Sequence, residues 1–368
     1  MMDLRQIVAL WSRDGARVLA TVIRVAGSSY RRPGARLLIT DSGTYAGTIS
    51  GGCLESEVLR KATWKVQTGA VVERYSTLFD DTAEIPFGLG CGGVVDLLLE
   101  PANTPECNAL LSAMERSLHG EQAKVVTWLP CEGKALRRAI LTPDGELLFA
   151  SQNLDDKKLA CTTGLVPGKE YEGRFVEWLH APQRLFVVGA GDDAKPVVAM
   201  AALMGWSVTV IDGRSHLAKA ERFPAADRVI CASDLSGLEI RSQDAVAVMT
   251  HSYEQDRSVL SAMLPLAPRY LGLLGARHRS ALLVTEAAAA AGLSIADCCD
   301  RIWAPVGLDL GGDGTEAIAL AIIAEVQAVC MGRAGASRRL MPEDIKRYVS
   351  EGDNARYLET QCATDLAR

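Results

Sequence analysis

Residues 185–212 constrain the fold of this chain more than any other segment. They begin with a short buried strand, LFVV, which enters a glycine turn, and continue with the helical stretch DDAKPVVAMAALMG. A second apolar strand, WSVTVID, follows and ends on an acidic residue. Strand, glycine turn, helix and strand in this order are typical of the first βαβ unit of a doubly wound sheet. The segment therefore predicts a Rossmann-type domain with a parallel sheet.

The turn itself reads Gly189-x-Gly191-x-x-Ala194, which is the G-x-G-x-x-A form of the dinucleotide fingerprint. We expect Gly189 to permit the tight turn, Gly191 to let the backbone approach a phosphate, and Ala194 to let the helix pack close to the strand. Asp212 lies 23 residues after Gly189, where an acidic side chain would meet a ribose hydroxyl.

Asp192 and Asp193 stand beside the predicted helix start, where a diphosphate would normally bind. Two carboxylates there would repel a bare diphosphate unless a metal ion or an unusual pose intervened. The alternative interpretation is that one of them caps the helix, with Pro196 in its first turn. We expect a ligand to bind at this turn. Conventional NAD chemistry is the weaker prediction.

Downstream, the alternation of strands and helices continues. DAVAVMT is an apolar strand that ends at His251, and YLGLLGA is another that ends near Arg277. Ligands of parallel sheets gather at the carboxyl ends of the strands, so His251 is a candidate binding residue. A lone histidine in such a place is as often structural.

The first half of the chain has a different pattern. A helix followed by a strand is predicted in residues 4–20, and a second helix from about Cys53 to Gln67 with Glu55 and Glu57 in its first turn. Further strands are expected within 71–99, around the loop PFGLGCGG, and a helix over 106–118 precedes three short strands. This mixture predicts an α+β domain.

The length of 368 residues suits two domains, which we place at 1–180 and 181–332, followed by a tail at 333–368. A net charge of −6 argues against nucleic-acid binding. The chain shows neither a secretory signal pattern nor an uninterrupted apolar run near 20 residues, so we expect a cytoplasmic protein without membrane partners. Ten cysteines without a CxxC pair argue against a zinc finger or an iron–sulfur cluster.

Six segments together resemble the XdhC/CoxI family, and they occur in that family's order. In the first half they are the single run GSSYRRPGARLLIT…GTISGGCLESEV and the loop GLGCGG, and the second half contains the other four. In the second half they are LFVVGAGDDAKPVV, then VMTHSYEQD with YLGLLGARHRS, and finally APVGLDLGGDGTEAIALAIIAEV. The chain departs from the family pattern at Tyr30 and Thr315, where the family often shows proline.

The resemblance implies an accessory protein, a chaperone or carrier rather than an enzyme. Proteins of this family bind molybdenum cofactor, protect its sulfurated form and promote its insertion into a xanthine-dehydrogenase-like molybdoenzyme. It implies a cysteine desulfurase as a further partner and a homodimer as the oligomeric state. Two alternatives remain at this point: an NAD(P)-dependent oxidoreductase, and a regulatory protein that binds NAD(P) or another nucleotide without catalysis.

The residue types fit a molybdopterin, which carries a phosphate, a pterin ring and an enedithiolate. Glycine-rich loops let backbone N–H groups approach the phosphate or the pterin edge, arginines neutralise the phosphate, and soft thiolates suit the metal. We expect Glu55 to orient a neighbouring cysteine or a cofactor amino group, and Cys53 and Cys91 to contact the metal. The remaining candidates for cofactor binding are Arg31, Arg32, Arg36, Gly51, Gly52, Gly92, Gly189, Gly191, Asp192, Asp193, Asp212 and His251.

Overall fold

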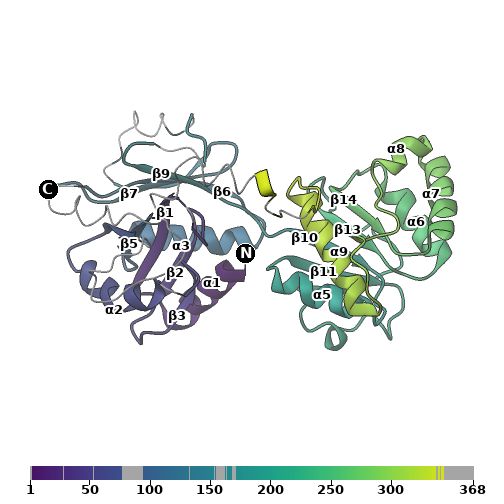
Figure 1. Cartoon of the computed structure of the whole chain (residues 1–368), viewed down its shortest axis with the longest axis horizontal. Helices are drawn as coiled ribbons and strands as arrows, with labels where there is room; N and C mark the ends of the chain where they lie inside the picture. Colours follow the sequence, from purple (N-terminus) through teal and green to yellow (C-terminus); the bar gives the residue numbers. More distant parts are fainter. Residues whose placement is uncertain are drawn as a thin grey trace. The chain divides into compact units, whose positions relative to one another are not determined.

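The structure is a computed structural model, shown in Figure 1. It describes residues 2–27, 29–52, 54–76, 94–131, 133–152, 154, 162, 164–167, 171–336, 339 and 341–343. The chain divides into two compact units, one within Asp3–Ala181 and one within Pro182–Arg338. We call them the N-terminal unit and the Rossmann unit. Residues 77–93 and most residues after 336 lie outside the described residues.

The N-terminal unit contains two antiparallel sheets. The first has the order β3-β2-β1-β5-β4 and the second the order β8-β7-β6-β9. The strands of the first sheet are β1 (Val18–Ala26), β2 (Arg36–Ile39), β3 (Tyr45–Gly47), β4 (Val71–Ser76) and β5 (Val94–Pro101). Those of the second are β6 (Ala123–Trp128), β7 (Arg137–Leu141), β8 (Leu147–Ala150) and β9 (Arg174–Leu179).

Three helices complete the described part of this unit: α1 (Met2–Asp14), α2 (Glu55–Lys65) and α3 (Pro105–Leu118). Helix α2 packs against the first sheet and forms one hydrophobic core with it. Helices α1 and α3 form a second core with strands of both sheets. Helix α3 starts where the sequence predicts because Thr104 accepts a hydrogen bond from the N–H of Cys107 at 3.2 Å and proline follows at its first position. The predicted α+β class is confirmed for this unit.

A buried ion pair joins the two sheets. Arg138 on β7 donates two hydrogen bonds to the carboxylate of Glu100 on β5, at 2.9 and 3.0 Å, and both side chains are only 1% exposed. Burial lowers the pKa of Arg138, but the charge of Glu100 outweighs it and holds the pKa above its ordinary value. Removing one partner of such a pair leaves an uncompensated buried charge, which costs about 3–5 kcal/mol.

The Rossmann unit is built on one five-stranded parallel sheet. Its strand order is β12-β11-β10-β13-β14, which places β10 in the centre. The strands are β10 (Arg184–Val188), β11 (Ser207–Asp212), β12 (Arg228–Cys231), β13 (Ala245–Val248) and β14 (Tyr270–Leu273). Since β11 and β13 flank β10 on opposite sides, the strand order reverses beside β10. The predicted Rossmann fold is confirmed, although β12 was not predicted.

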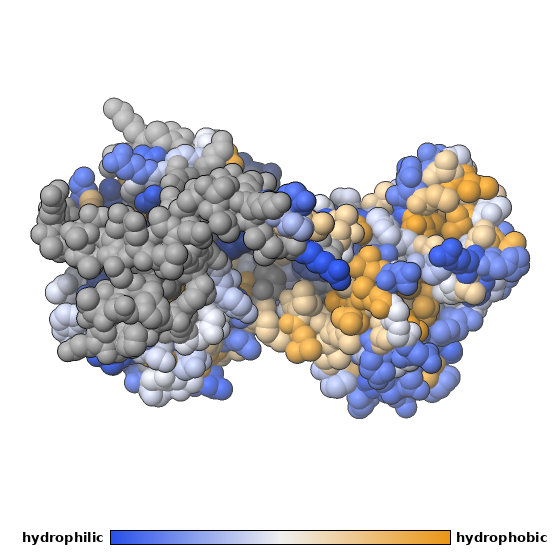
Figure 2. Space-filling view, in the orientation of Figure 1, coloured by the Kyte–Doolittle hydropathy of each residue, from blue (hydrophilic) through white to orange (hydrophobic). Residues whose placement is uncertain are grey.

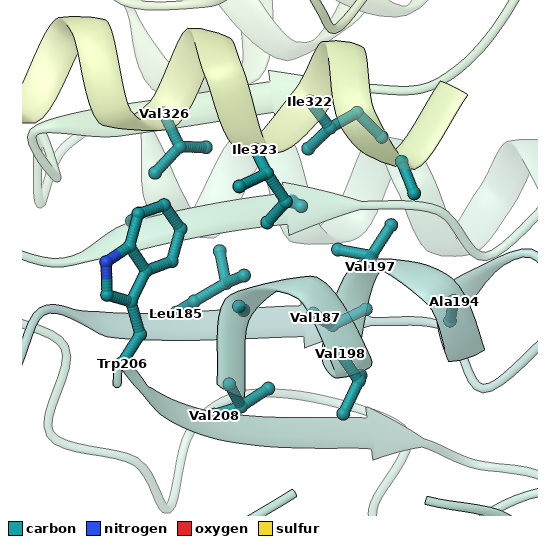
Figure 3. Close-up of a cluster of buried hydrophobic side chains, with 14 of the residues drawn as sticks. Leu185, Val187, Ala194, Val197, Val198, Trp206, Val208, Ile322, Ile323 and Val326 are labelled. Atoms are coloured by element: carbon teal, nitrogen blue, oxygen red, sulfur yellow. The ribbon is translucent and has the colours of Figure 1, made fainter. Parts of the chain in front are cut away.

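Helices cover both faces of this sheet. Helices α5 (Ala194–Leu203) and α9 (Thr315–Cys330) lie on one face, and α6 (Tyr253–Met263) and α7 (Arg277–Ala291) share the core of the other. Figure 3 shows Ile322, Ile323 and Val326 of α9 pointing towards the sheet, with Ile322 and Ile323 above Val197 of α5 and Val326 above Trp206. Each such side chain stabilises the unit by about 1.5–3 kcal/mol when fully buried. The turn after β10 thus lies at the end of a central strand that is packed on both faces.

Apolar side chains also reach the surface of the Rossmann unit, where Figure 2 shows them as orange patches. On α9, Ile322 is buried while Leu320 is 53% exposed, so this helix is apolar on more than its inner face. Among the described residues, no helix combines the length and the apolar character needed to cross a membrane.

Candidate functional site

The turn after β10 has the backbone geometry that its glycines predict. Gly189 has φ +119°, and a Cβ on it would collide with the backbone carbonyl of Met249, which follows the neighbouring strand β13. Its N–H donates to the carbonyl of Ile211 at 2.8 Å. Ala194 is completely buried at the start of α5, as close packing of helix and strand requires. Only glycine fits at position 189, because the chain passes the end of β13 without room for a side chain.

At Gly191, where the sequence suggests that a phosphate could approach the backbone, the structure places a carboxylate of the chain itself. A Cβ on Gly191 would stand far inside van der Waals contact with Oδ1 of Asp193. The absent side chain therefore makes room for the carboxylate of Asp193, which folds back over the turn. Asp193 occupies the N-cap position of α5, yet its side chain makes no capping hydrogen bond. The predicted capping by an aspartate is wrong, because this carboxylate turns towards His251 instead. Pro196 does lie in the first turn of α5.

Asp192 is exposed and forms ion pairs with two basic side chains. Its Oδ1 lies 2.7 Å from Nζ of Lys195 and 2.8 Å from Nη2 of Arg222, and these hydrogen bonds lower the pKa of Asp192. The same arginine donates to the carbonyl of Ala190 at 2.7 Å, which anchors it to the turn. The expected repulsion by two bare carboxylates is therefore wrong for Asp192, since two cations neutralise it.

Both carboxylate oxygens of Asp212, at the end of β11, accept hydrogen bonds from neighbouring residues. Oδ2 accepts the N–H of Ala190 at 2.8 Å, and Arg214 donates to Oδ1 through its backbone N–H and Nε and to Oδ2 through Nη2. Burial raises the pKa of Asp212, but these hydrogen bonds outweigh it and bring the pKa to about 2. The side chain is 2% exposed, and its hydrogen bonds to Ala190 and Arg214 brace the turn.

His251 follows β13 and completes the group around the turn. Its Nε2 lies 2.8 Å from Oδ2 of Asp193, and its side chain is 61% exposed. The backbone of His251 has φ +60°, a left-handed conformation that is uncommon outside glycine. Its neighbour Thr250 donates its hydroxyl to the buried Asp256 at 2.6 Å, and Asp256 accepts from Arg279 at 2.7 Å. This network holds the loop that presents the imidazole.

A shallow pocket lies beside these residues, between the carboxyl ends of β10, β11, β12 and β13. Its polar lining includes Asp212, Thr250, Ser233, Asp234 and Gln255. Ser233, Asp234 and Gln255 were not among the residues predicted from the sequence. Two of them closely follow β12, whose weakly apolar sequence RVIC is half-exposed and carries no clear strand pattern. If β12 had been predicted, Ser233 and Asp234 would have been candidates as residues at the carboxyl end of a parallel strand.

In the N-terminal unit, Glu55 organises the loop that precedes α2. Its Oε1 accepts the N–H groups of Ile49 at 3.0 Å and Ser50 at 2.9 Å, and its Oε2 accepts the hydroxyl of Ser50. The Ser50 hydroxyl in turn accepts the N–H of Gly52 at 3.2 Å. Burial raises the pKa of Glu55, but these hydrogen bonds lower it by more. The result is an exposed Gly51–Gly52 turn with φ +109° at Gly52.

The three candidate arginines of this unit have different surroundings. Arg31 forms an ion pair with Asp3 of α1, and Arg36 is buried against Glu177 of β9. Arg32 is exposed, and within the described residues it has no ion-pair partner. A buried, paired guanidinium cannot receive a phosphate from solvent, so we remove Arg36 from the candidate site and give first place to Arg32.

Three of the candidates lie outside the described residues: Cys53, Cys91 and Gly92. In the part of the chain that is described, no group of three or more histidine, cysteine, aspartate or glutamate side chains has the arrangement of a metal site. The structure thus brings the Rossmann candidates together around one turn, and it places Gly51, Gly52 and Glu55 in one loop of the N-terminal unit.

Comparison with known families matches both units. Residues 10–76 match the XdhC and CoxI family, and residues 185–326 match the XdhC Rossmann domain. A crystal structure from Bacillus halodurans, described as a xanthine dehydrogenase, is 28% identical, with a TM-score of 0.77 over 94% of this chain and 99% of that chain.

Two curated relatives extend over most of the chain. A Bacillus subtilis (strain 168) protein, named as a probable component of xanthine dehydrogenase, is 28% identical over 86% of this chain and 94% of that protein. The molybdenum cofactor insertion chaperone PaoD of Escherichia coli (strain K12) is 26% identical over 88% of this chain and 86% of that protein. With both of its units matched in the expected order, this chain belongs to the XdhC and CoxI family.

Proposed function

We propose that this protein binds molybdenum cofactor and delivers it to a xanthine-dehydrogenase-like molybdoenzyme as an accessory chaperone. The names of two relatives, one a xanthine dehydrogenase component and the other a cofactor insertion chaperone, support this role. The structural observation that carries the proposal is the loop held by Glu55. A buried carboxylate that accepts three hydrogen bonds from one turn keeps Gly51 and Gly52 at the surface in a defined conformation.

The surface around this turn has the chemistry that a pterin phosphate requires. Exposed glycines without side chains let a ligand approach the backbone of this turn. The exposed guanidinium of Arg32, on the loop that also carries Tyr30, suits a phosphate. The ring of Tyr30 lies 3.7 Å from where a Cβ of Gly51 would stand, and its side chain is 74% exposed. An aromatic face in this position suits stacking with a planar heterocycle.

Cys53 directly follows this turn in sequence, and we propose that it contacts the metal or its sulfido ligand together with Cys91. A thiolate is a soft ligand and matches a metal already bound by an enedithiolate. As partners we propose the client molybdoenzyme and a cysteine desulfurase that supplies sulfur, and as the oligomeric state a homodimer. Light scattering of the purified protein tests the last point directly.

The test is the cofactor content of protein purified from a host supplied with molybdate. Pterin fluorescence after oxidation and molybdenum by mass spectrometry are both expected above a control protein. Cys53→Ala should lose most of the metal signal. Cys131→Ala is the matched control, because Cys131 is exposed in the same unit and belongs to another loop. If the unmodified protein carries neither pterin nor molybdenum, and a deletion strain still activates its molybdoenzyme, the proposal is wrong.

A further inference from the structure

The Rossmann unit has a fingerprint for dinucleotides, but its own side chains occupy the places that a dinucleotide needs. In that fingerprint the second glycine leaves space so that a diphosphate can approach the backbone. Here the space above Gly191 holds Oδ1 of Asp193, and Cδ2 of His251 lies 3.9 Å from the same point. The diphosphate position is therefore filled by a carboxylate of the chain.

This carboxylate is held in place from the neighbouring strand. His251 binds it at 2.8 Å, and Asp193 is only 15% exposed. The left-handed backbone of His251 is kept by its neighbour Thr250, whose hydroxyl is fixed by Asp256. A strained conformation persists only where the surroundings enforce it, and such residues gather at functional positions.

The ribose position is occupied as well. In dinucleotide-binding domains an acidic residue at the end of the second strand accepts the ribose hydroxyls. The corresponding Asp212 already accepts hydrogen bonds from Ala190 and from the backbone and side chain of Arg214. Two recognition points of the fingerprint are thus satisfied internally.

We infer that Asp193 is a specificity-determining residue that excludes dinucleotides from the Rossmann unit by filling the diphosphate position above Gly191, with His251 as the group that holds it there. Exclusion acts through occupancy and not through charge. Lys195 and Arg222 neutralise Asp192, so the repulsion that this second carboxylate exerts on a diphosphate is small. The unit keeps the Rossmann scaffold for a ligand other than NAD or FAD.

Four variants separate occupancy from charge. Asp193→Ala and Asp193→Ser empty the position, Asp193→Asn fills it with a neutral group of the same shape, and Asp192→Asn removes a neighbouring charge. Each full-length variant is titrated with NADH by fluorescence and with ADP-ribose by calorimetry. Circular dichroism and the thermal unfolding midpoint show which variants remain folded. The titrations contain no molybdenum cofactor, so their outcome is independent of the proposed carrier function.

The unmodified protein is expected to show no saturable binding up to the highest probe concentration, and Asp193→Ala and Asp193→Ser should bind both probes with a Kd at least about tenfold below that concentration. Asp193→Asn and Asp192→Asn should behave like the unmodified protein. Three results would each overturn the inference: micromolar binding of NADH by the unmodified protein, an equal gain in Asp193→Asn, or no gain in a folded Asp193→Ala or Asp193→Ser.

Discussion

The carboxylate of Glu55 accepts the backbone N–H of Ser50 at 2.9 Å, five residues before it in the chain. The same carboxylate accepts the N–H of Ile49 and the Ser50 hydroxyl, so the first turn of α2 holds the preceding loop from inside the protein. Sequence alone suggests that Glu55 orients a cysteine or a cofactor amino group. The structure instead assigns both of its oxygens to the preceding loop, which makes Glu55 a positioning residue.

Glu55→Ala should destabilise the N-terminal unit by about 2–4 kcal/mol, because it leaves two buried N–H groups without an acceptor. Urea unfolding followed by far-ultraviolet circular dichroism measures this change. Glu57→Ala is the control from the same helical turn, since Glu57 forms its ion pairs with the exposed side chains of Arg60 and Lys61. Its expected cost is about 1 kcal/mol or less. Equal losses in the two variants would contradict the assigned role of Glu55.

Arg32 and Arg36 should separate cofactor binding from stability. Arg32→Gln is expected to lower the pterin content of the purified protein while leaving the unfolding midpoint unchanged, because its guanidinium is exposed. Arg36→Gln is expected to cost about 3–5 kcal/mol of stability, because it leaves Glu177 buried without its partner. Pterin fluorescence and urea unfolding measure the two effects. A loss of pterin in a stable Arg36→Gln protein would argue against this division.

The stability of the Rossmann unit should depend on Asp212 in acid. Its pKa of about 2 in the folded state lies below its ordinary value of 3.8, so the carboxylate contributes stability above about pH 4. That contribution is lost as the pH falls from about 4 to 2. Asp212→Asn should be less stable at neutral pH and show a flatter decline in this window, measured by urea unfolding at each pH. Glu254→Gln, which alters an exposed ion pair, should keep the original slope.

Gly189→Ala should destabilise the Rossmann unit by about 3 kcal/mol or more, since it adds a strained φ and a collision with the carbonyl of Met249. Gly237→Ala is the matched control, because a Cβ at Gly237 would meet nothing within 4 Å and its φ is not positive. The control should change stability by less than about 1 kcal/mol. Thermal unfolding measures both, and a small effect at Gly189 would show that the turn can relax.

Local signals in the sequence predicted much of the fold. The run LFVV before Gly189 and the apolar strand ending in Asp212 located β10 and β11, because a buried parallel strand reads as a continuous apolar run. The helix predicted over 106–118 is present as α3, and the structure shows that Thr104 caps it. Strand β12 was missed because an edge strand that is half-exposed has no such run. Its absence from the prediction also hid Ser233 and Asp234, which line the pocket.

The sequence by itself determined the Rossmann βαβ unit, the glycine at 189 and the family, since these depend on residue types at fixed spacing along one segment. Only the tertiary structure decided what the charged residues do. Asp192 is paired with Arg222, Asp193 with His251 and Arg36 with Glu177 of a distant strand, and Asp212 accepts the N–H of Ala190 from the turn. The sequence pattern of an aspartate beside a glycine turn is the same whether the side chain binds a ligand or pairs with another residue of the chain. The pairing residue lies on another strand or loop, so only the tertiary structure shows which of the two occurs.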